Sequence, residues 1–191
     1  MNTYDWLHGA GFVWLVFLLF WFLSARKLKS VKTSEPRGER IRQMVFVSLA
    51  YILLFNDVFR FTPLGRRLYP CESWMGPLGF AIALLGVAFA IWARWHLGSN
   101  WSATVTLKHD HELIRSGPYR WIRHPIYTGM LSSIAGVAFL LGEIRGYLAF
   151  FILFLAFYSK ARKEERFLTG EFGEKFQEHL RHTGMFLPKL F

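Results

Sequence analysis

A dense run of polar residues at positions 111–129 has the composition of a small-molecule pocket. Within it, Pro125 forces the backbone of His124 away from helical angles and is itself well placed in the first turn of a helix. The backbone amides of Ile126 and Tyr127 would then stay without helical partners, and such a helix start attracts a polar or anionic ligand group. We therefore expect a small molecule to bind where this helix begins.

A second polar run follows a long apolar stretch and begins at Lys160. Lys160 and Glu164 are four residues apart, as are Arg162 and Arg166, so each pair would share one face of a helix. Alternating charge of this kind is typical of a solvated helix end. Two adjacent acids, Glu164 and Glu165, are costly at a membrane boundary unless they are paired or functional. This pair is therefore a second candidate for chemistry.

The elements that must position these residues belong to a membrane protein, as the composition indicates. Of the 191 residues, 53% are hydrophobic, 18% are aromatic and 19% are charged, whereas soluble domains average roughly 45–50% apolar and about 25% charged residues. One small core cannot hide so much apolar surface, but lipid can. The single cysteine, Cys71, excludes a disulfide within the chain and a thiolate metal site.

Five apolar runs are long enough, alone or with flanking residues, to cross about 30 Å of hydrocarbon at roughly 1.5 Å per helical residue. No basic residue precedes the first run and several follow it, so we expect a retained anchor, not a cleaved signal peptide. The sequence predicts an all-α fold, an integral membrane bundle of about five transmembrane helices. The runs are residues 9–25, 43–56, 77–93, 125–142 and 146–159.

The distribution of basic residues predicts how this bundle is oriented. With five spans, the connections and tail on one side carry nineteen of the 23 Lys and Arg residues, and the other side carries four. The positive-inside rule then places the N-terminus outside, and the C-terminus and both polar runs on the cytoplasmic side. The formal charge of +10 is mostly this orientation signal. We expect no nucleic-acid partner, because no recognition motif accompanies it.

A short connection brings the two polar runs together. Only residues 143–145 separate the fourth and fifth predicted spans, so these spans must form an antiparallel hairpin whose far ends meet on the cytoplasmic side. We expect a single membrane domain, residues 1–191. Its N-terminal two-span part covers residues 1–76, and its catalytic part covers residues 77–191 with the third to fifth spans.

The ordered motifs of residues 85–190 resemble those of the isoprenylcysteine carboxyl methyltransferase family, within a wider group that includes phospholipid N-methyltransferases. The most specific element is the Arg123-His124-Pro125-x-Tyr127 stretch, followed by Glu164-Glu165 some 37 residues later. The resemblance implies a multi-span membrane enzyme that takes its methyl group from S-adenosylmethionine on the cytoplasmic side. The other motifs are Ala93-Arg94, Leu97-Gly98, Trp101-Ser102, His111-x-Leu113-Ile114, Gly117-x-Tyr119, Gly129, Phe172-Gly173 and Phe186-Leu187-Pro188.

The resemblance also implies roles for individual residues. A basic residue one turn before the first acid contacts substrate in the family. The positions that correspond to the cofactor pocket are His111, Glu112, Leu113, Ile114, Tyr119, His124, Pro125, Ile126, Tyr127 and Glu164. The catalytic candidates are Arg123, Lys160, Arg162 and Glu165.

The acceptor of the methyl group stays open at this point. A carboxylate acceptor needs a cation to position it, which Lys160, Arg162 or Arg123 could provide. An amine or thiol acceptor needs a base, for which Glu165 or His124 is the candidate. A prenylated cysteine, a phospholipid or another lipophilic or membrane-embedded substrate all suit the same cofactor. The family usually has tyrosines at two positions where this chain has Phe176 and His179, so any hydroxyl contribution there is absent.

Two other interpretations compete with methyl transfer. Sterol and steroid reductases are similar in their C-terminal membrane segments and use a nicotinamide cofactor, so an NADPH-dependent oxidoreductase is one alternative. A non-catalytic membrane protein of the same architecture is the other. We expect no metal cofactor, because the pair His109 and His111 alone makes a poor metal site.

Overall fold

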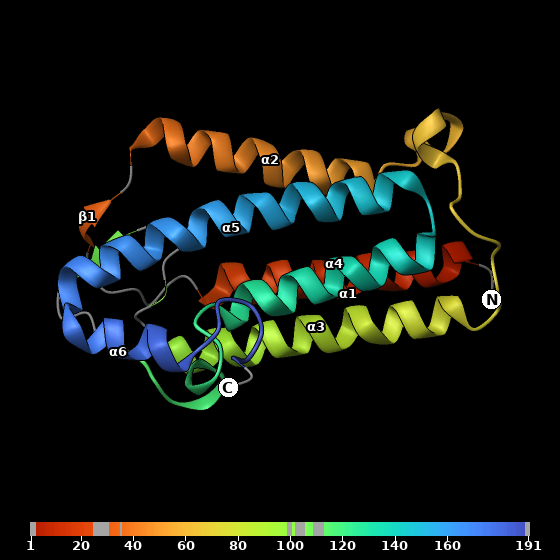
Figure 1. Ribbon diagram of the computed structural model, residues 1–191. Helices are drawn as coiled ribbons and strands as arrows, with labels where there is room; N and C mark the ends of the chain where they lie inside the picture. The colour runs from red at the N-terminus through yellow and green to blue at the C-terminus, as the bar shows by residue number, and fades with distance from the viewer. Residues whose placement is uncertain are drawn as a thin grey trace.

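Five long helices lie side by side in one elongated bundle, and a sixth, short helix lies at one end (Figure 1). The computed structural model describes residues 3–24, 31–34, 36–98, 101, 106–108 and 113–189. The helices are α1 (Thr3–Ser24), α2 (Arg37–Phe55), α3 (Met75–Leu97), α4 (Pro125–Leu141), α5 (Ile144–Phe172) and α6 (Glu174–His182). Short 3₁₀ turns are η1 (Asp57–Phe61), η2 (Pro63–Gly65) and η4 (Gly117–Arg120).

Each predicted apolar run overlaps one of the five long helices, but the helix lengths differ from the expectation. Three of them, α1, α3 and α5, are long and apolar enough to cross a membrane. The fifth run continues without a break into the second polar run, so that α5 has 29 residues. Conversely, α4 has 17 residues, or about 25 Å at 1.5 Å per residue. The fourth run therefore forms the shortest of the five long helices.

Two short strands add to the helical fold that the sequence predicts. Strand β1 (Val31–Ser34) pairs antiparallel with β2 (Thr106–Lys108), with Val31 opposite Lys108 and Ser34 opposite Thr106. Segments of three or four residues are too short for a pattern of alternating hydrophobicity, so the sequence gives no local signal for them. The pair connects the segment before α2 with the segment before α4.

The helix pair α3 and α4 packs through glycine. A Cβ atom on Gly86 would lie 2.5 Å from the backbone nitrogen of Ser133, and one on Gly129 would lie 2.6 Å from the carbonyl oxygen of Gly86. Small residues let two backbones approach this closely within a membrane bundle. Around them, a buried apolar core of residues such as Ala90 and Ile134 continues to α1, α2 and α5. This rigid frame fixes where α4 begins.

The two ends of the bundle carry different elements. The N-terminus lies at one end, together with the tight turn at Gly142, whose φ of +63° favours glycine (Figure 1). Helix α6 and the C-terminal segment lie toward the other end, where α5 stops at Gly173 with a φ of +51°. This second end is called the site end below. The start of α4 and the end of α5 meet there, as the hairpin prediction requires.

Candidate active site

Helix α4 begins at Pro125, as the sequence predicts, and the chain before it is held by the C-terminal segment. His124 precedes the helix with φ −122° and ψ 59°, outside the helical region, and makes no side-chain cap. The backbone nitrogen of Arg123 donates to the carbonyl oxygen of Gly184 (2.9 Å), and that of His124 donates to Met185 (3.1 Å). The non-helical backbone is thus paired with another irregular segment and is rigid.

The side chains before α4 meet the two acids of α5. Arg123 Nε donates to Glu165 Oε1 over 2.7 Å. The imidazole of His124 lies between both acids, with Nδ1 3.4 Å from Glu164 Oε2 and Nε2 3.3 Å from Glu165 Oε1. Tyr127 joins from the first turn of α4, where its hydroxyl donates to Glu164 Oε1 over 2.7 Å. We call Arg123, His124, Tyr127, Glu164 and Glu165 the His124 cluster.

Aromatic and basic side chains complete the surroundings of Tyr127. Its ring is stacked between His124, at 5.5 Å between ring centres, and Phe157 of α5, at 5.0 Å. Lys160 Nζ lies 5.6 Å from the centre of the same ring, a distance at which a cation and an aromatic face attract. Lys160 is therefore next to the cluster and one helical turn before Glu164.

Exposure differs among the members of the cluster in a way that suits binding. The side chains of Arg123, His124 and Glu165 are 11%, 6% and 8% exposed, whereas Glu164 is 22% exposed. Burial lowers the pKa of His124, but hydrogen bonds with Glu164 and Glu165 and their negative charges outweigh burial and raise it. The two carboxylates thus favour the protonated form of the imidazole beside Arg123. Glu164 is the member most open to a ligand.

The remaining predicted residues lie beside the cluster or away from it. The hydroxyl of Tyr119 donates to the carbonyl oxygen of Ala93 over 3.3 Å, and burial raises the pKa of Tyr119 above its usual value. Pro125 and Ile126 are buried in the first turn of α4, and Ile114 packs against the patch that holds Tyr119. Leu113 is half-buried, and His111 and Glu112 lie outside the described residues.

Arg162 is the catalytic candidate that the structure does not bring to the cluster. It is exposed on α5, and no ion pair joins it to another described residue. The buried face of this helix instead carries Lys160, Ala161 and Glu165. A position one residue after Ala161 is rotated by about 100° from it, toward the surface.

Two residues near the C-terminus support the cluster, and sequence reasoning gave neither a role. Arg123 Nη1 donates to the carbonyl oxygen of Thr183, the residue that directly follows α6. Phe186 lies edge-on to His124 at 6.2 Å, and its carbonyl oxygen accepts from Thr128 Oγ1 over 2.7 Å. Phe186 belongs to the closing Phe-Leu-Pro motif, so the sequence did indicate that this segment matters. No motif of the sequence includes Thr183.

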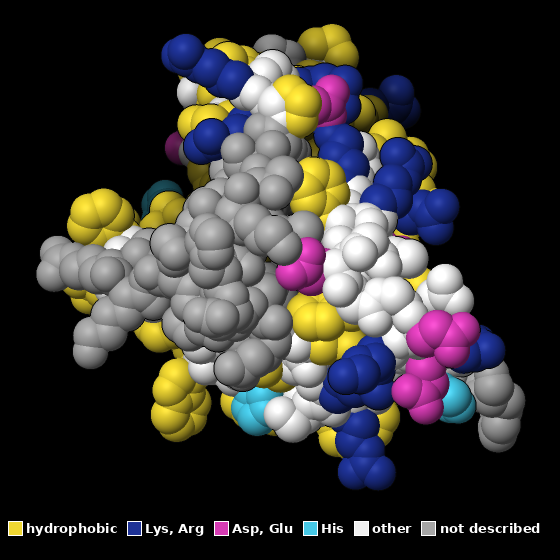
Figure 2. Space-filling model, turned by 90° about the vertical axis from the view of Figure 1, so that its left-hand side faces the viewer, with side chains coloured by type: hydrophobic (Ala, Val, Ile, Leu, Met, Phe, Trp, Pro, Cys, Tyr) yellow, Lys and Arg dark blue, Asp and Glu magenta, His cyan; other side chains and the backbone are white. Residues whose placement is uncertain are grey.

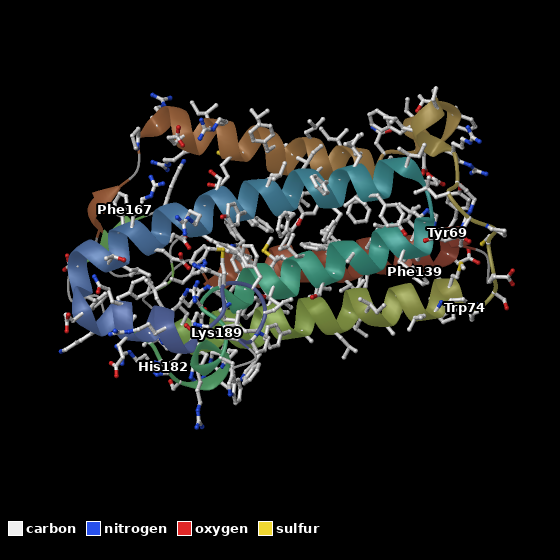
Figure 3. The ribbon with its side chains drawn as sticks, in the orientation of Figure 1. Tyr69, Trp74, Phe139, Phe167, His182 and Lys189 are labelled. Atoms are coloured by element: carbon white, nitrogen blue, oxygen red, sulfur yellow. The ribbon has the colours of Figure 1, made fainter. Side chains whose placement is uncertain are left out.

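Helix α6 turns its apolar face toward this assembly. Phe176 and His179 are buried and lie 6.2 Å apart between ring centres. Burial, together with the positive charges of Arg115, Arg123, His124 and His182, lowers the pKa of His179 to about 4. His179 is therefore neutral near pH 7, and its pKa is shifted in the opposite direction from that of His124. Figure 3 shows Phe167, His182 and Lys189 toward this end of the molecule.

The arrangement can bind a small zwitterionic or cationic molecule. Carboxylates accept hydrogen bonds from hydroxyl and ammonium groups, and aromatic faces contact cations. The positive end of the helix dipole at the start of α4 suits a carboxylate. Among the described residues, no group of three or more His, Cys, Asp or Glu side chains is placed to hold a metal ion.

Comparison with known proteins gives this geometry a family. Residues 78–170 match the isoprenylcysteine carboxyl methyltransferase (ICMT) family. Over 120 residues the chain is 32% identical to the cobalt-zinc-cadmium resistance protein CzcN of Cupriavidus metallidurans, covering 62% of this chain and 53% of CzcN. Over 184 residues it is 31% identical to protein-S-isoprenylcysteine O-methyltransferase of Xenopus laevis, covering 93% of this chain and 64% of the relative.

A solved structure supports the same assignment at the level of the fold. The eukaryotic intramembrane Ras methyltransferase ICMT, solved without a monobody, superposes with a TM-score of 0.61 at 22% identity. The match covers 77% of this chain and 52% of that chain. The chain thus spans about half to two thirds of the length of these relatives. The matched region contains the start of α4 and both acids of α5, so the residues of the His124 cluster lie in the part of the chain that is similar to the isoprenylcysteine carboxyl methyltransferase family.

Proposed function

We propose that the chain is an integral membrane methyltransferase that moves a methyl group from S-adenosylmethionine to a lipophilic acceptor. One observation carries the proposal. The two polar runs that the family motifs single out, 37 residues apart in sequence, meet in the His124 cluster through contacts of 2.7–3.4 Å. The match of residues 78–170 to the family supports the reaction, and three apolar helices of membrane-spanning length support the location.

The residues present fit the proposed cofactor. Glu164 is partly exposed and acidic, so it would hold the ribose hydroxyls or the ammonium group of S-adenosylmethionine. The N-terminal turn of α4 would receive its carboxylate, and backbone groups of residues 111–114 would bind the adenine. Tyr127 would hold Glu164 in place through its hydroxyl, and Tyr119 would supply an aromatic face for the cationic sulfonium. When bound, S-adenosylmethionine supplies a methyl group activated on a sulfonium.

The protein's own task in this reaction is alignment and the exclusion of water, because an in-line displacement needs no covalent nucleophile. Arg123 and Lys160 are the cations that would position an anionic acceptor, and both lie at the cluster. With an amine or thiol acceptor, Glu165 or His124 would remove the proton. Glu165 Oε1 already accepts from Arg123, which favours the role of a charge-positioning group for Glu165.

We place the site on the cytoplasmic side, with the N-terminus outside. The uneven distribution of Lys and Arg supports this orientation. Figure 2 shows basic side chains spread over the site end, with fewer acidic ones between them. The catalytic part would comprise residues 77–191, with residues 1–76 as a two-helix partner. An acceptor embedded in the bilayer could then reach the cluster sideways, while the cofactor arrives from water.

Calorimetric titration of the detergent-purified chain tests the proposal. S-adenosylmethionine should bind saturably, and NADPH should not, because the family match does not favour the sterol-reductase alternative. Glu164→Gln should weaken binding, and Glu174→Gln, an exposed acid at the start of α6, should leave it unchanged. Binding of NADPH alone would favour the reductase. A folded preparation that binds neither would favour the non-catalytic interpretation.

A further inference from the structure

A groove between α2 and α5 opens beside the candidate active site. It has a volume of about 160 Å³. One wall is apolar, with Phe46 of α2 facing Ile152 and Leu155 of α5. The other end of the groove is charged and lies nearer the site end, where α2 begins and α5 leaves the apolar run. The groove is thus amphipathic along its length.

A single carboxylate lies between two cations at the charged end. Glu39 Oε2 accepts from Arg42 Nη2 over 2.6 Å and also contacts Lys163 Nζ, across from α2 to α5. Lys160 lines the same groove. Arg42 and Lys163 thus face the single carboxylate of Glu39, and this group of three side chains keeps a positive surplus. A negative charge brought into this end would be attracted.

The groove faces outward to lipid and not into the protein. Phe46 and Leu155, which line it, are 43% and 54% exposed, and Met44 and Val45 next to them on α2 are 68% and 58% exposed. Apolar side chains with this much exposure suit acyl chains in a membrane bundle. The charged end follows along the same helices, and in the proposed membrane orientation it would lie at the level of the lipid headgroups, where long basic side chains are common.

We propose that this groove binds one anionic phospholipid, with its acyl chain along Phe46, Ile152 and Leu155 and its phosphate between Arg42 and Lys163. The Glu39 carboxylate occupies the place of that phosphate, and the headgroup displaces it on binding. Glu39 thereby sets how readily the groove fills. The proposal concerns lipid binding alone, so it stands or falls separately from methyl transfer. Lys160 links the two, because it lines the groove and contacts Tyr127.

Photo-crosslinking in vesicles tests the proposal. The chain is reconstituted in phosphatidylcholine with a small fraction of phosphatidylglycerol that carries a photoactivatable acyl chain, and crosslinked peptides are mapped by mass spectrometry. We expect crosslinks on residues 43–46 and 152–156. Glu39→Gln should raise this labelling severalfold, since it removes the competing carboxylate. The double variant Arg42→Gln/Lys163→Gln should lower it severalfold. S-adenosylmethionine affinity, measured in parallel, checks the active site.

Matched controls separate this account from general effects of charge. Glu174→Gln makes the same charge change in the first turn of α6, away from the groove, and should leave labelling at the wild-type level. Photoactivatable phosphatidylcholine should label the groove weakly and equally in all variants. Equal phosphatidylglycerol labelling of wild type, Glu39→Gln and the double variant would overturn the proposal. So would equal labelling of the groove by photoactivatable phosphatidylcholine and phosphatidylglycerol in wild type, which would show that the charged end does not select an anionic lipid.

Discussion

Two buried arginine–glutamate pairs lie at opposite ends of the bundle. One belongs to the candidate active site, and the other holds the fold together. At the site end, Arg123 and Glu165 meet over 2.7 Å. At the other end, Arg145 Nε donates to Glu143 Oε2 over 2.5 Å, and their side chains are 0% and 3% exposed. Both pairs lie near the ends of the α4–α5 hairpin, so position alone does not distinguish them. Their surroundings do.

The pair at the far end is enclosed by structural contacts. Arg145 Nη1 donates to the carbonyl oxygen of Asn56 over 2.8 Å, which ties the start of α5 to the end of α2. Nearby, the hydroxyl of Tyr69 donates to the carbonyl oxygen of Phe139 over 2.7 Å. Figure 3 shows Tyr69, Phe139 and Trp74 gathered at this end. Every contact here joins one part of the chain to another.

The site end instead has more ionisable groups than folding requires. A second acid, a histidine and a tyrosine join the Arg123–Glu165 pair, and Glu164 keeps 22% of its side chain exposed. Buried charges are costly unless they are paired or functional. The comparison shows that a buried ion pair alone does not indicate a binding site. A binding site is indicated when further titratable groups join the pair and one of them, here Glu164, is partly exposed.

The largest expected effect is the loss of stability in Glu143→Gln. The substitution leaves Arg145 buried without its counter-charge, which costs about 3–5 kcal/mol of unfolding free energy. Denaturant titration in detergent measures it, and S-adenosylmethionine affinity of the folded fraction should stay at the wild-type value. Glu143→Asp keeps the charge and should recover part of the loss. Unchanged stability in Glu143→Gln would remove the contrast between the ends.

Next in size is the effect of Glu164→Gln on cofactor affinity. Losing a hydrogen bond to a charged group costs about 1.5–3 kcal/mol, which is about tenfold to a hundredfold in the dissociation constant. Calorimetry should show this drop while the unfolding midpoint changes little, since Glu164 is the open member of the cluster. A variant with large destabilisation and normal affinity would make Glu164 a structural residue.

Tyr127→Phe should have a smaller effect of the same kind. It removes the 2.7 Å hydrogen bond to Glu164 but keeps the ring between His124 and Phe157. A single hydrogen bond contributes about 0.5–1.5 kcal/mol net, so affinity should fall about threefold to tenfold. In the double variant with Glu164→Gln the two losses should not add, because both remove one interaction. Full additivity would contradict the proposed pairing.

The two buried histidines of the site end should give stability opposite dependences on pH. The pKa of His124 is raised above 6.5, so its contribution is complete below pH 6.5 and is lost as pH rises through the folded-state value. The pKa of His179 is lowered to about 4, so its contribution is present above pH 6.5 and is lost as pH falls toward 4. The unfolding midpoint of the wild type should therefore fall at both acidic and alkaline pH. His124→Gln should reduce the fall at alkaline pH, and His179→Gln should reduce the fall at acidic pH. Midpoint–pH curves that run parallel in the wild type and both variants would contradict both assignments.

The smallest expected effect belongs to Arg162→Gln. The side chain is exposed on α5, and surface substitutions of this kind usually change stability by less than about 0.5 kcal/mol. Cofactor affinity and turnover should stay within about twofold of wild type. A large loss of turnover with normal affinity would instead restore the catalytic role that the family resemblance implies.

Local sequence patterns predicted where α4 begins and which acids of α5 meet it. The other contacts of the site depend on tertiary packing. Pro125 determined where α4 begins, and the short connection at residues 143–145 brought Glu164 and Glu165 to it. The rotation of α5 about its axis was not predictable from charge spacing, which is why Arg162 stood beside Lys160 as a candidate. The contacts of Thr183 and the groove beside Glu39 arise between segments far apart in sequence, where no local pattern exists.

Photolabelling tests most directly whether the site end binds the cofactor and the far end only maintains the fold. S-adenosylmethionine with a radiolabelled methyl group is crosslinked to the purified chain by ultraviolet light, and the labelled peptides are sequenced. The account predicts label on residues 111–127 or on the end of α5 around Glu164, with label lost in Glu164→Gln and retained in Glu143→Gln. Saturable label confined to other segments, or label that Glu164→Gln leaves intact, would contradict it.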